Sequence, residues 1–133
     1  MTSTKAGLDP DCLFCRWIGQ GRPVKTFGTA AAFYDGYPVT EGHMLVVPVR
    51  HVADWLSMTG QEIRDSEALI RLLVDEIRSR DSAVSGFNIG MNIGASAGQS
   101  VFHAHIHLIP RRDGDAENPR GGIRGVIDGS RCY

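Results

Sequence analysis

The stretch V-F-H-A-H-I-H-L-I-P at residues 101–110 decides how the rest of the chain is interpreted. Its apolar and polar side chains alternate, as in a β-strand whose successive side chains point to opposite faces. One face is expected to enter a core and carries Phe102, Ala104, Ile106 and Leu108. The other face carries three of the chain's five histidines, His103, His105 and His107. Neighbouring histidines would lie about 6.6 Å apart at the rise of a strand.

The residues alone leave three interpretations of this histidine face open. A face exposed to water normally mixes Thr, Lys and Glu, so three imidazoles disfavour it. Histidines at alternate positions of a strand can also ligate zinc together, because imidazole suits that ion. The third interpretation is nucleophilic chemistry, since a neutral imidazole attacks phosphorus well and leaves again well.

The preceding loop, G-A-S-A-G-Q-S at residues 94–100, favours the nucleophilic interpretation. Backbone N–H groups in such a turn form a nest for an anion, and Gly98 lets a phosphate approach the main chain closely. Gln99 and Ser100 add short polar donors. Asn92, just upstream, is placed to fix a histidine tautomer or to bind a ribose or phosphate oxygen.

Outside this region the pattern predicts strands at residues 29–35, 42–49 and 86–93 and one long helix at residues 59–80. Thr59 and Glu62 fit a capping box at the start of the helix. Apolar residues follow helical spacing at Ile63, Leu69, Ile70, Leu73, Val74 and Ile77. Strands on both sides of one long helix predict an α+β domain with a mainly antiparallel sheet.

The composition is that of one ordinary globular domain: 133 residues, 42% apolar, 22% charged and a net charge of −1. Without a basic field, broad nucleic-acid binding is not expected. No apolar run approaches the roughly 20 residues that cross a bilayer. The first residues lack the apolar core of a signal peptide, so we expect a cytoplasmic protein with no membrane partner.

The three cysteines are too few for a disulfide scaffold. Cys12 and Cys15 form a C-x-x-C, which in a reducing compartment indicates a metal ligand pair or a redox pair before a disulfide. A redox role is disfavoured because no thioredoxin-like strand and helix surround the motif. A free thiol pair remains an alternative, and Cys132 is interpreted as a spare thiol.

Together these stretches resemble the histidine triad (HIT) family. H-A-H-I-H-L-I at residues 103–109 matches the motif His-φ-His-φ-His-φ-φ, where φ is apolar. The wider match comprises G-H-M-L-V-V-P-V-R-H at 42–51, the stretch at 86–111, C-L-F-C at 12–15 and F-Y-D at 33–35. The resemblance implies a HIT-like α+β fold, with a domain at 11–111 between a flexible tail at 1–10 and a C-terminal tail at 112–133.

The resemblance is to the family's small nucleotide-binding hydrolases and transferases, and it implies covalent catalysis at a nucleotide α-phosphate. His105 would be the nucleophile and would form a nucleotidyl-histidine intermediate. His107 would contact the phosphate and assist the leaving group, and His43 would belong to the same network. Water would then release a nucleoside monophosphate from a phosphoramidate or a dinucleoside polyphosphate. No catalytic cofactor is expected.

The resemblance also implies a binding site for a purine nucleotide or nucleotide conjugate. Gly98, Gln99 and Ser100 would contact the phosphate and leaving group, and Asn92 the ribose and phosphate. Asp35 would accept hydrogen bonds from the ribose hydroxyls, and the base would lie against Leu13, Phe14 and Phe33. Each residue has a plainer alternative: a core position for Phe14, Phe33 and His43, a turn former at Asp35, and loop caps for the others.

A zinc site is implied by wider relatives, including the hexose-phosphate uridylyltransferases, that combine a C-x-x-C with two histidines. Carried over, the ligands are Cys12, Cys15, His51 and His103, and the role of the metal is structural. It would tie the N-terminal segment to the histidine stretch and help to position His105.

Further expectations concern assembly and rival functions. The family resemblance implies a homodimer joined through sheet edges or helices. A metal-dependent enzyme that uses all three triad histidines as ligands would predict a β-barrel with a nearby carboxylate. A nucleotide-binding regulatory module with little turnover is the second rival. Residues 118–124 place two arginines among glycines, which suits an arm over phosphates, a dimer contact or a flexible tail.

Overall fold

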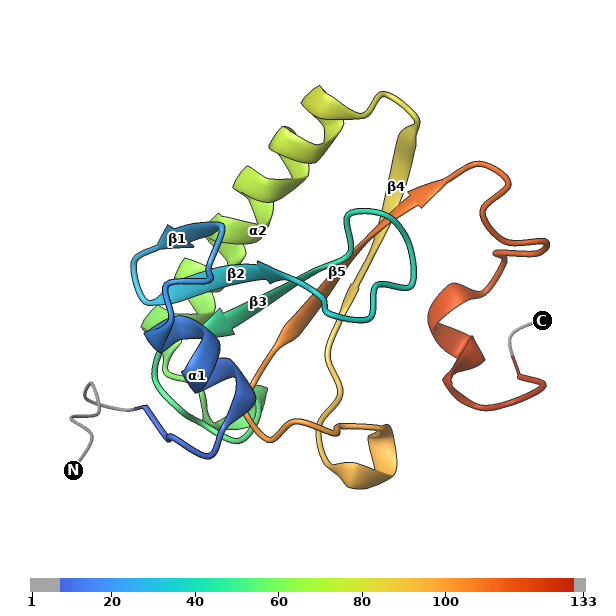
Figure 1. The fold of residues 1–133 in the computed structure, drawn as a ribbon. Helices are drawn as coiled ribbons and strands as arrows, with labels where there is room; N and C mark the ends of the chain where they lie inside the picture. The colour runs from blue at the N-terminus through green and yellow to red at the C-terminus, as the bar shows by residue number, and fades with distance from the viewer. Residues whose placement is uncertain (1–7, 131–133) are drawn as a thin grey trace.

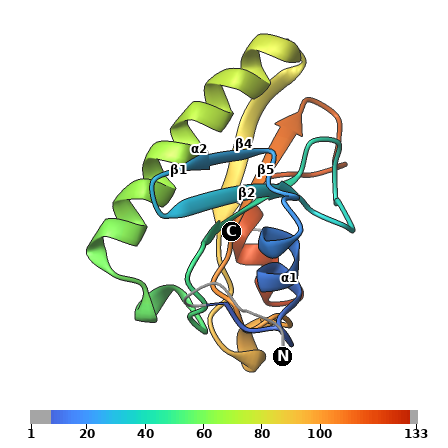
Figure 2. The same cartoon turned by 60° about the vertical axis from the view of Figure 1, so that its left-hand side comes forward.

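A computed structural model describes residues 8–130. The fold has three layers, of which the middle one is a single antiparallel sheet. The sheet has five strands in the order β1-β2-β3-β5-β4. The long helix α2 covers one face, and the short helix α1 lies on the other (Figures 1 and 2). The expected α+β fold, a mainly antiparallel sheet with one long helix, is confirmed.

The elements follow the chain from α1 to the C-terminal turn η3. The helices are α1 (Leu13–Gly19) and α2 (Gly60–Arg80). The strands are β1 (Lys25–Phe27), β2 (Ala30–Tyr34), β3 (Met44–Pro48), β4 (Val84–Gly90) and β5 (Ile106–Arg112). Three 3₁₀ turns are η1 (Trp55–Ser57), η2 (Ala95–Ala97) and η3 (Gly122–Val126). None of the helices within the described residues has the length and apolar character needed to cross a membrane.

Helix α2 forms as its sequence predicts and supplies one side of the main core. The Thr59 hydroxyl accepts from the Glu62 amide at 3.1 Å, and the Glu62 carboxylate accepts from the Thr59 amide at 2.8 Å, which completes the capping box. The apolar stripe packs on one face of the sheet. Its buried members are Leu69, Leu73 and Ile77, and they meet Ala30, Ala32, Met44, Val46, Val84, Ile106 and Leu108.

The opposite face of the sheet carries a second apolar cluster under α1. The alternate side chains of β2 and β3 point there, so both strands are buried on two sides and have almost no polar residues. The cluster comprises Cys12, Phe14, Cys15, Ala31, Phe33, Leu45 and Val47. Helix α1 was not predicted, because seven residues provide less than two turns of apolar periodicity. Strand β1 was not predicted either, because its three residues are too few to show an alternating pattern.

The prediction of one strand over residues 101–110 is wrong for its first half, because β5 begins only at Ile106. In residues 101–105 the backbone groups bond elsewhere: the Ala104 amide donates to the Val52 carbonyl at 2.7 Å. Phe102, expected in the core, is 49% exposed, whereas Ala104, Ile106 and Leu108 are buried as predicted. The strand also continues past the predicted end to Arg112.

The neighbouring predictions shift by a few residues. Strand β4 ends at Gly90, so Asn92 lies in the loop that follows rather than in the strand predicted at 86–93. Just beyond the strand, Arg111 closes a turn through two hydrogen bonds to Asp115, at 2.8 and 2.9 Å. Residues 1–7 of the predicted N-terminal tail, and Cys132, lie outside the described residues.

Two leucines of α2 test whether the helix is held by its core face. Leu69 is fully buried and Leu72 is 41% exposed. We expect Leu69→Ala to lower the free energy of unfolding by about 3 kcal/mol, since a buried leucine leaves a cavity. Leu72→Ala, the matched control, is expected to change it by less than about 1 kcal/mol. Urea unfolding followed by circular dichroism measures both, and equal losses would contradict the assigned core.

Candidate active site and metal centre

The three triad histidines diverge instead of sharing one flat face. His103 is fully buried and turns toward α1, whereas His107 lies on β5 opposite Leu45 of β3 and turns toward His43. His105 lies between them, with its ring centroid 5.2 Å from that of His107. Within residues 8–130 no cluster of possible metal ligands contains all three histidines, which disfavours the interpretation as one triad-bound ion.

The backbone fixes the tautomer of His105. Its Nδ1 lies 2.8 Å from the carbonyl oxygen of His103. A carbonyl only accepts, so Nδ1 carries the proton and donates it. In the neutral ring Nε2 therefore keeps its lone pair. His105 is only 9% exposed, and its ring stands edge-on to Phe14, with 5.1 Å between the ring centroids.

A second chain of hydrogen bonds fixes the tautomers of His43 and His107. The Val39 amide donates to His43 Nδ1 at 3.1 Å, so the proton of a neutral His43 is on Nε2. His43 Nε2 then donates to His107 Nδ1 at 2.9 Å. This leaves the proton of His107 on its Nε2, where it is free to be donated to a ligand.

Burial keeps this histidine pair neutral. It lowers the pKa of His43 below its ordinary value of 6.5, partly offset by the Asp35 carboxylate, whose Oδ2 lies 3.4 Å from His43 Nε2. Burial also lowers the pKa of His107, and the neighbouring imidazoles lower it further. Both rings are therefore neutral near pH 7, as the tautomer assignment requires. The other Asp35 oxygen accepts from the Tyr37 amide at 2.8 Å, so Asp35 also forms the turn that was its alternative role.

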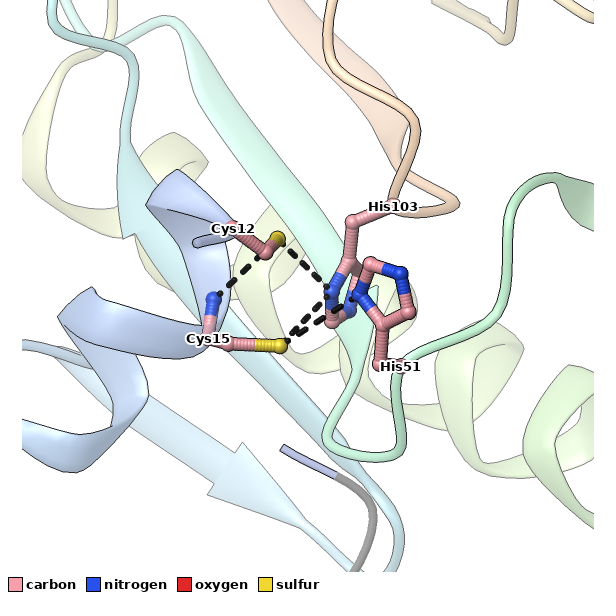
Figure 3. Close-up of side chains that lie close together, drawn as sticks. All are labelled: Cys12, Cys15, His51 and His103. Atoms are coloured by element: carbon pink, nitrogen blue, oxygen red, sulfur yellow. Dashed lines mark hydrogen bonds between the residues drawn. The ribbon is translucent and has the colours of Figure 1, made fainter. Parts of the chain in front are cut away.

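The two cysteines and the two remaining histidines converge as predicted, with all four donor atoms within 4.8 Å of one another (Figure 3). Cys12 Sγ lies 3.5 Å from His103 Nδ1, and Cys15 Sγ lies 3.4 Å from the same nitrogen. Cys15 Sγ is 3.5 Å from His51 Nδ1. A tetrahedral zinc ion with ordinary bond lengths would hold sulfur and nitrogen about 3.6 Å apart, so the donor set fits zinc.

Protonation in this cluster also suits a metal. His103 Nε2 donates to the Pro48 carbonyl at 2.7 Å, which leaves Nδ1 as the free donor atom facing the sulfurs. Burial lowers the pKa of His103 to about 4, so the ring is neutral. Burial raises the pKa of the Cys15 thiol to about 11, so metal binding would release a proton from it.

The predicted phosphate loop is braced by one of its own residues. The Gln99 side chain accepts from the Gly94 amide at 2.9 Å and donates to the carbonyls of Ala53 at 2.6 Å and Val101 at 3.1 Å. All its polar atoms are thus engaged within the protein, and the side chain is 4% exposed. Gly98 has φ of 95°, a left-handed conformation that a side chain would strain.

The predicted ligand-contacting residues fall in three places. His43, Asn92, Gly98 and His107 line one open groove of about 920 Å³. Leu13 and Ser100 line a second groove of about 390 Å³ beside the cysteines. Phe14 and Phe33 are 3% and 2% exposed and form an aromatic cluster that touches His105.

Two groups of residues at the site were not predicted from the sequence. Trp17 joins the aromatic cluster, with ring centroids 5.6 Å from Phe14 and 5.3 Å from Phe33. Its spacing of three from Phe14 was a signal, but only for a helix that was not predicted. Ile123, Val126 and Ile127 line the large groove, although their segment was described only by its arginines and glycines.

Comparisons with known proteins agree with this geometry. The HIT domain family model matches residues 22–114. A HIT-like protein of Mycoplasma pneumoniae is 33% identical over 116 residues, which cover 84% of this chain and 78% of that protein. The AP-4-A phosphorylase of Mycobacterium tuberculosis is 40% identical over 81 residues, which cover 60% of this chain but only 41% of the phosphorylase.

Solved structures extend the likeness to three dimensions. A zinc-bound histidine triad family protein from Mycobacterium smegmatis superposes with a TM-score of 0.73 at 29% identity, covering 81% of this chain and 80% of that one. The matches in sequence and structure, together with the arrangement of His103, His105 and His107, show that the chain belongs to the HIT domain family.

Proposed function

We propose that the protein hydrolyses or transfers a nucleotide at its α-phosphate, with His105 as the nucleophile. The observation that carries this proposal is the 2.8 Å hydrogen bond from His105 Nδ1 to the His103 carbonyl, because it leaves the Nε2 lone pair available for attack. The coarser activity, that of a nucleotide-binding hydrolase or transferase, is the one that family membership supports.

The reaction would proceed in two displacements. His105 Nε2 forms a bond to the α-phosphorus, and the bond from phosphorus to the leaving group breaks. The departing amine takes a proton from solvent, while His107 Nε2–H, oriented by the chain from Val39 through His43, donates a hydrogen bond to a phosphate oxygen. Water then attacks the phosphorus and gives a proton back to solvent, the bond to His105 breaks, and the monophosphate leaves.

The binding groups proposed around this centre follow the arrangement of the site. The phosphate would approach the turn at Gly98, which Gln99 holds in shape, and Asn92 lines the same groove. Asp35 lies beside His43 and would accept from the ribose. A purine base would lie against the aromatic cluster of Phe14 and Phe33, which touches His105.

The substrates we propose are nucleoside phosphoramidates and dinucleoside polyphosphates. The second class is supported by the likeness to the AP-4-A phosphorylase, of whose length this chain spans less than half. A nucleotide-binding regulatory module with little turnover would use the same pocket. Turnover measured beside nucleotide affinity separates the two functions.

We further propose that Cys12, Cys15, His51 and His103 hold a structural zinc ion. The donor distances of 3.4 and 3.5 Å support it, and so does the zinc-bound relative from Mycobacterium smegmatis. His103 would then connect two sites, because its ring faces the metal donors and its carbonyl orients His105. Zinc-binding cysteines have to stay reduced, so we place the protein in the cytoplasm.

We also propose a homodimer joined through the free edge of β4. This strand ends the sheet. The groove between it and α2 is lined by apolar residues, among them Trp55, Ile70, Val74, Ile89 and Met91, and by the charged Glu67, Arg71, Asp75 and Arg78. An uncovered edge strand beside apolar surface invites pairing with a second chain.

The nucleophile is tested with adenosine 5′-phosphoramidate. Wild type is expected to release AMP and to show a transient AMP adduct in intact-protein mass spectrometry. His105→Asn, which cannot form the adduct, is expected to lose about 10³-fold or more of the turnover. Circular dichroism checks that the variant is folded. An adduct that persists in His105→Asn would refute the assignment, and AMP binding without turnover in wild type would favour the regulatory module.

Metal binding is tested with the three cysteines. Wild type is expected to contain one equivalent of zinc by elemental analysis, and Cys12→Ser and Cys15→Ser to lose it, because each removes a thiolate ligand. Cys132→Ser is the matched control and is expected to retain zinc. Chelation is expected to lower the melting temperature of wild type and not that of Cys12→Ser. Equal zinc in all four proteins would contradict the site.

The dimer is tested by light scattering coupled to size exclusion. Wild type is expected to show twice the chain mass of 14.5 kDa. Ile89→Arg places a charge on the β4 edge, at a position that is 45% exposed, and is expected to shift the protein toward the monomer mass. Val24→Arg, at a position 53% exposed beside the opposite sheet edge, is the control. A monomeric wild type would exclude the proposal.

A further inference from the structure

Residues 50–53, a short segment just after β3, contact two parts of the site through their main chain. The Val52 carbonyl accepts from the Ala104 amide at 2.7 Å, in the middle of the histidine stretch. The Ala53 carbonyl accepts from the Gln99 side chain at 2.6 Å, and Gln99 braces the predicted phosphate loop. The position of this segment therefore affects both the histidines and the loop.

The contact at Val52 acts on the peptide unit that orients the proposed nucleophile. The Ala104 amide and the His103 carbonyl belong to the same peptide unit, which is planar and trans. Its N–H group donates to Val52, and its carbonyl points the opposite way and accepts from His105 Nδ1 at 2.8 Å. Fixing one end of a rigid plane also fixes the other end. The Val52 carbonyl therefore helps to set the tautomer of His105.

The segment is joined to helix α2 by the side chain of its first residue. The Arg50 guanidinium makes two hydrogen bonds to the Glu62 carboxylate, from Nε to Oε2 at 3.0 Å and from Nη2 to Oε1 at 2.8 Å. Such a two-point contact between charged groups fixes orientation as well as distance. A third hydrogen bond, from Nη2 to the Ser57 carbonyl, is longer, at 3.4 Å. Arg50 thus connects the segment to the first turn of α2.

Glu62 is a rigid partner, because its own position is fixed. The residue is 4% exposed, and its Oε1 also accepts from the Thr59 amide at 2.8 Å in the capping box. The hydrogen bonds from Arg50 lower the pKa of Glu62, so the carboxylate stays ionised although it is buried. Without Arg50, a buried negative charge would lose its partner and the segment would lose its link to the helix.

Apolar packing supports the segment without setting its direction. Val52 is buried with Met58 and Ala104, and Ile63 of α2 packs against them. His51 of the same segment faces the cysteines (Figure 3). Contacts between apolar side chains are non-directional. The bidentate pair therefore supplies the direction that packing does not.

We propose that Arg50 and Glu62 are positioning residues for the nucleotidyl transfer. They act through the Val52 carbonyl on the peptide unit that precedes Ala104, and through that unit on the proton of His105. This inference rests on the proposed function. When the pair is broken, the peptide unit gains freedom to turn and the His105 proton redistributes between Nδ1 and Nε2. A neutral ring protonated at Nε2 has no lone pair there for attack on phosphorus.

The kinetic test uses Arg50→Met, which keeps the unbranched chain, and Glu62→Gln, which keeps a capping group for Thr59. Both are expected to lower kcat for AMP release from adenosine 5′-phosphoramidate about tenfold and to change KM less than about twofold, because misplacing the reacting group affects the chemical step. Lys25→Met is the matched control, since Lys25 pairs with Glu76 and joins α2 to the opposite edge of the sheet. It is expected to leave kcat unchanged.

The second test measures the tautomer in the folded protein by long-range proton–nitrogen NMR of the histidine rings. Wild type is expected to show His105 protonated on Nδ1, whereas Arg50→Met and Glu62→Gln are each expected to show a mixture of the two tautomers. Leu69→Ala removes a buried side chain of the same helix and is the comparison for stability. A loss of stability alone leaves the tautomer of the folded protein unchanged, so this variant is expected to match wild type.

The proposal requires both a lower kcat and a mixed tautomer in the variants of the pair. A wild-type kcat in either folded variant would overturn it. A wild-type tautomer would overturn it as well, because it would exclude the route through the peptide unit. Circular dichroism shows which variants fold, and Glu62→Gln decides alone if Arg50→Met does not. If wild type releases no AMP, the proposed function fails, and the NMR comparison then decides whether the pair positions His105.

Discussion

The hydrogen bond from the His105 ring to the carbonyl of His103 is the constraint on which the rest of the site depends. It forms because residues 101–105 leave the sheet, so that the carbonyl is free to meet a side chain two residues ahead. A regular strand would have used that carbonyl in a ladder and pointed all three imidazoles the same way. The departure from regular structure thus gives the three histidines different surroundings.

His103 shows how closely the surroundings of these histidines are connected. Its ring nitrogen Nε2 donates to the Pro48 carbonyl, its Nδ1 faces two sulfurs, and its own carbonyl orients His105. The proposed zinc site, the end of β3 and the proposed nucleophile therefore meet in one residue. A displacement of α1 relative to β3 would move the His103 ring and, with it, the His103 carbonyl that orients His105. The buried cysteines are therefore physically connected to the His105 ring.

Much of the fold and of the site could be predicted from the sequence, and the failures have physical reasons. The long helix was predictable because its stripe and its Thr59–Glu62 box are local signals. The ligand cluster was predictable through the resemblance to relatives that combine a C-x-x-C with two histidines, because Cys12 and Cys15 alone show only half of a zinc site. The early part of β5 was predicted wrongly because side-chain alternation at residues 101–105 persists where the ladder does not. Helix α1 and the groove lining at Ile123, Val126 and Ile127 were missed, since neither segment has a local periodicity long enough to identify it.

The groups that select the protonation of the site belong largely to the main chain: the Val39 amide and the carbonyls of Pro48 and His103. Almost any residue at these positions still presents the same amide or carbonyl, a proline at 39 being the exception. The side chains that line the site can therefore change during evolution without changing which ring nitrogen carries the proton. A lineage can reshape the groove for new chemical groups while the underlying proton arrangement is inherited intact.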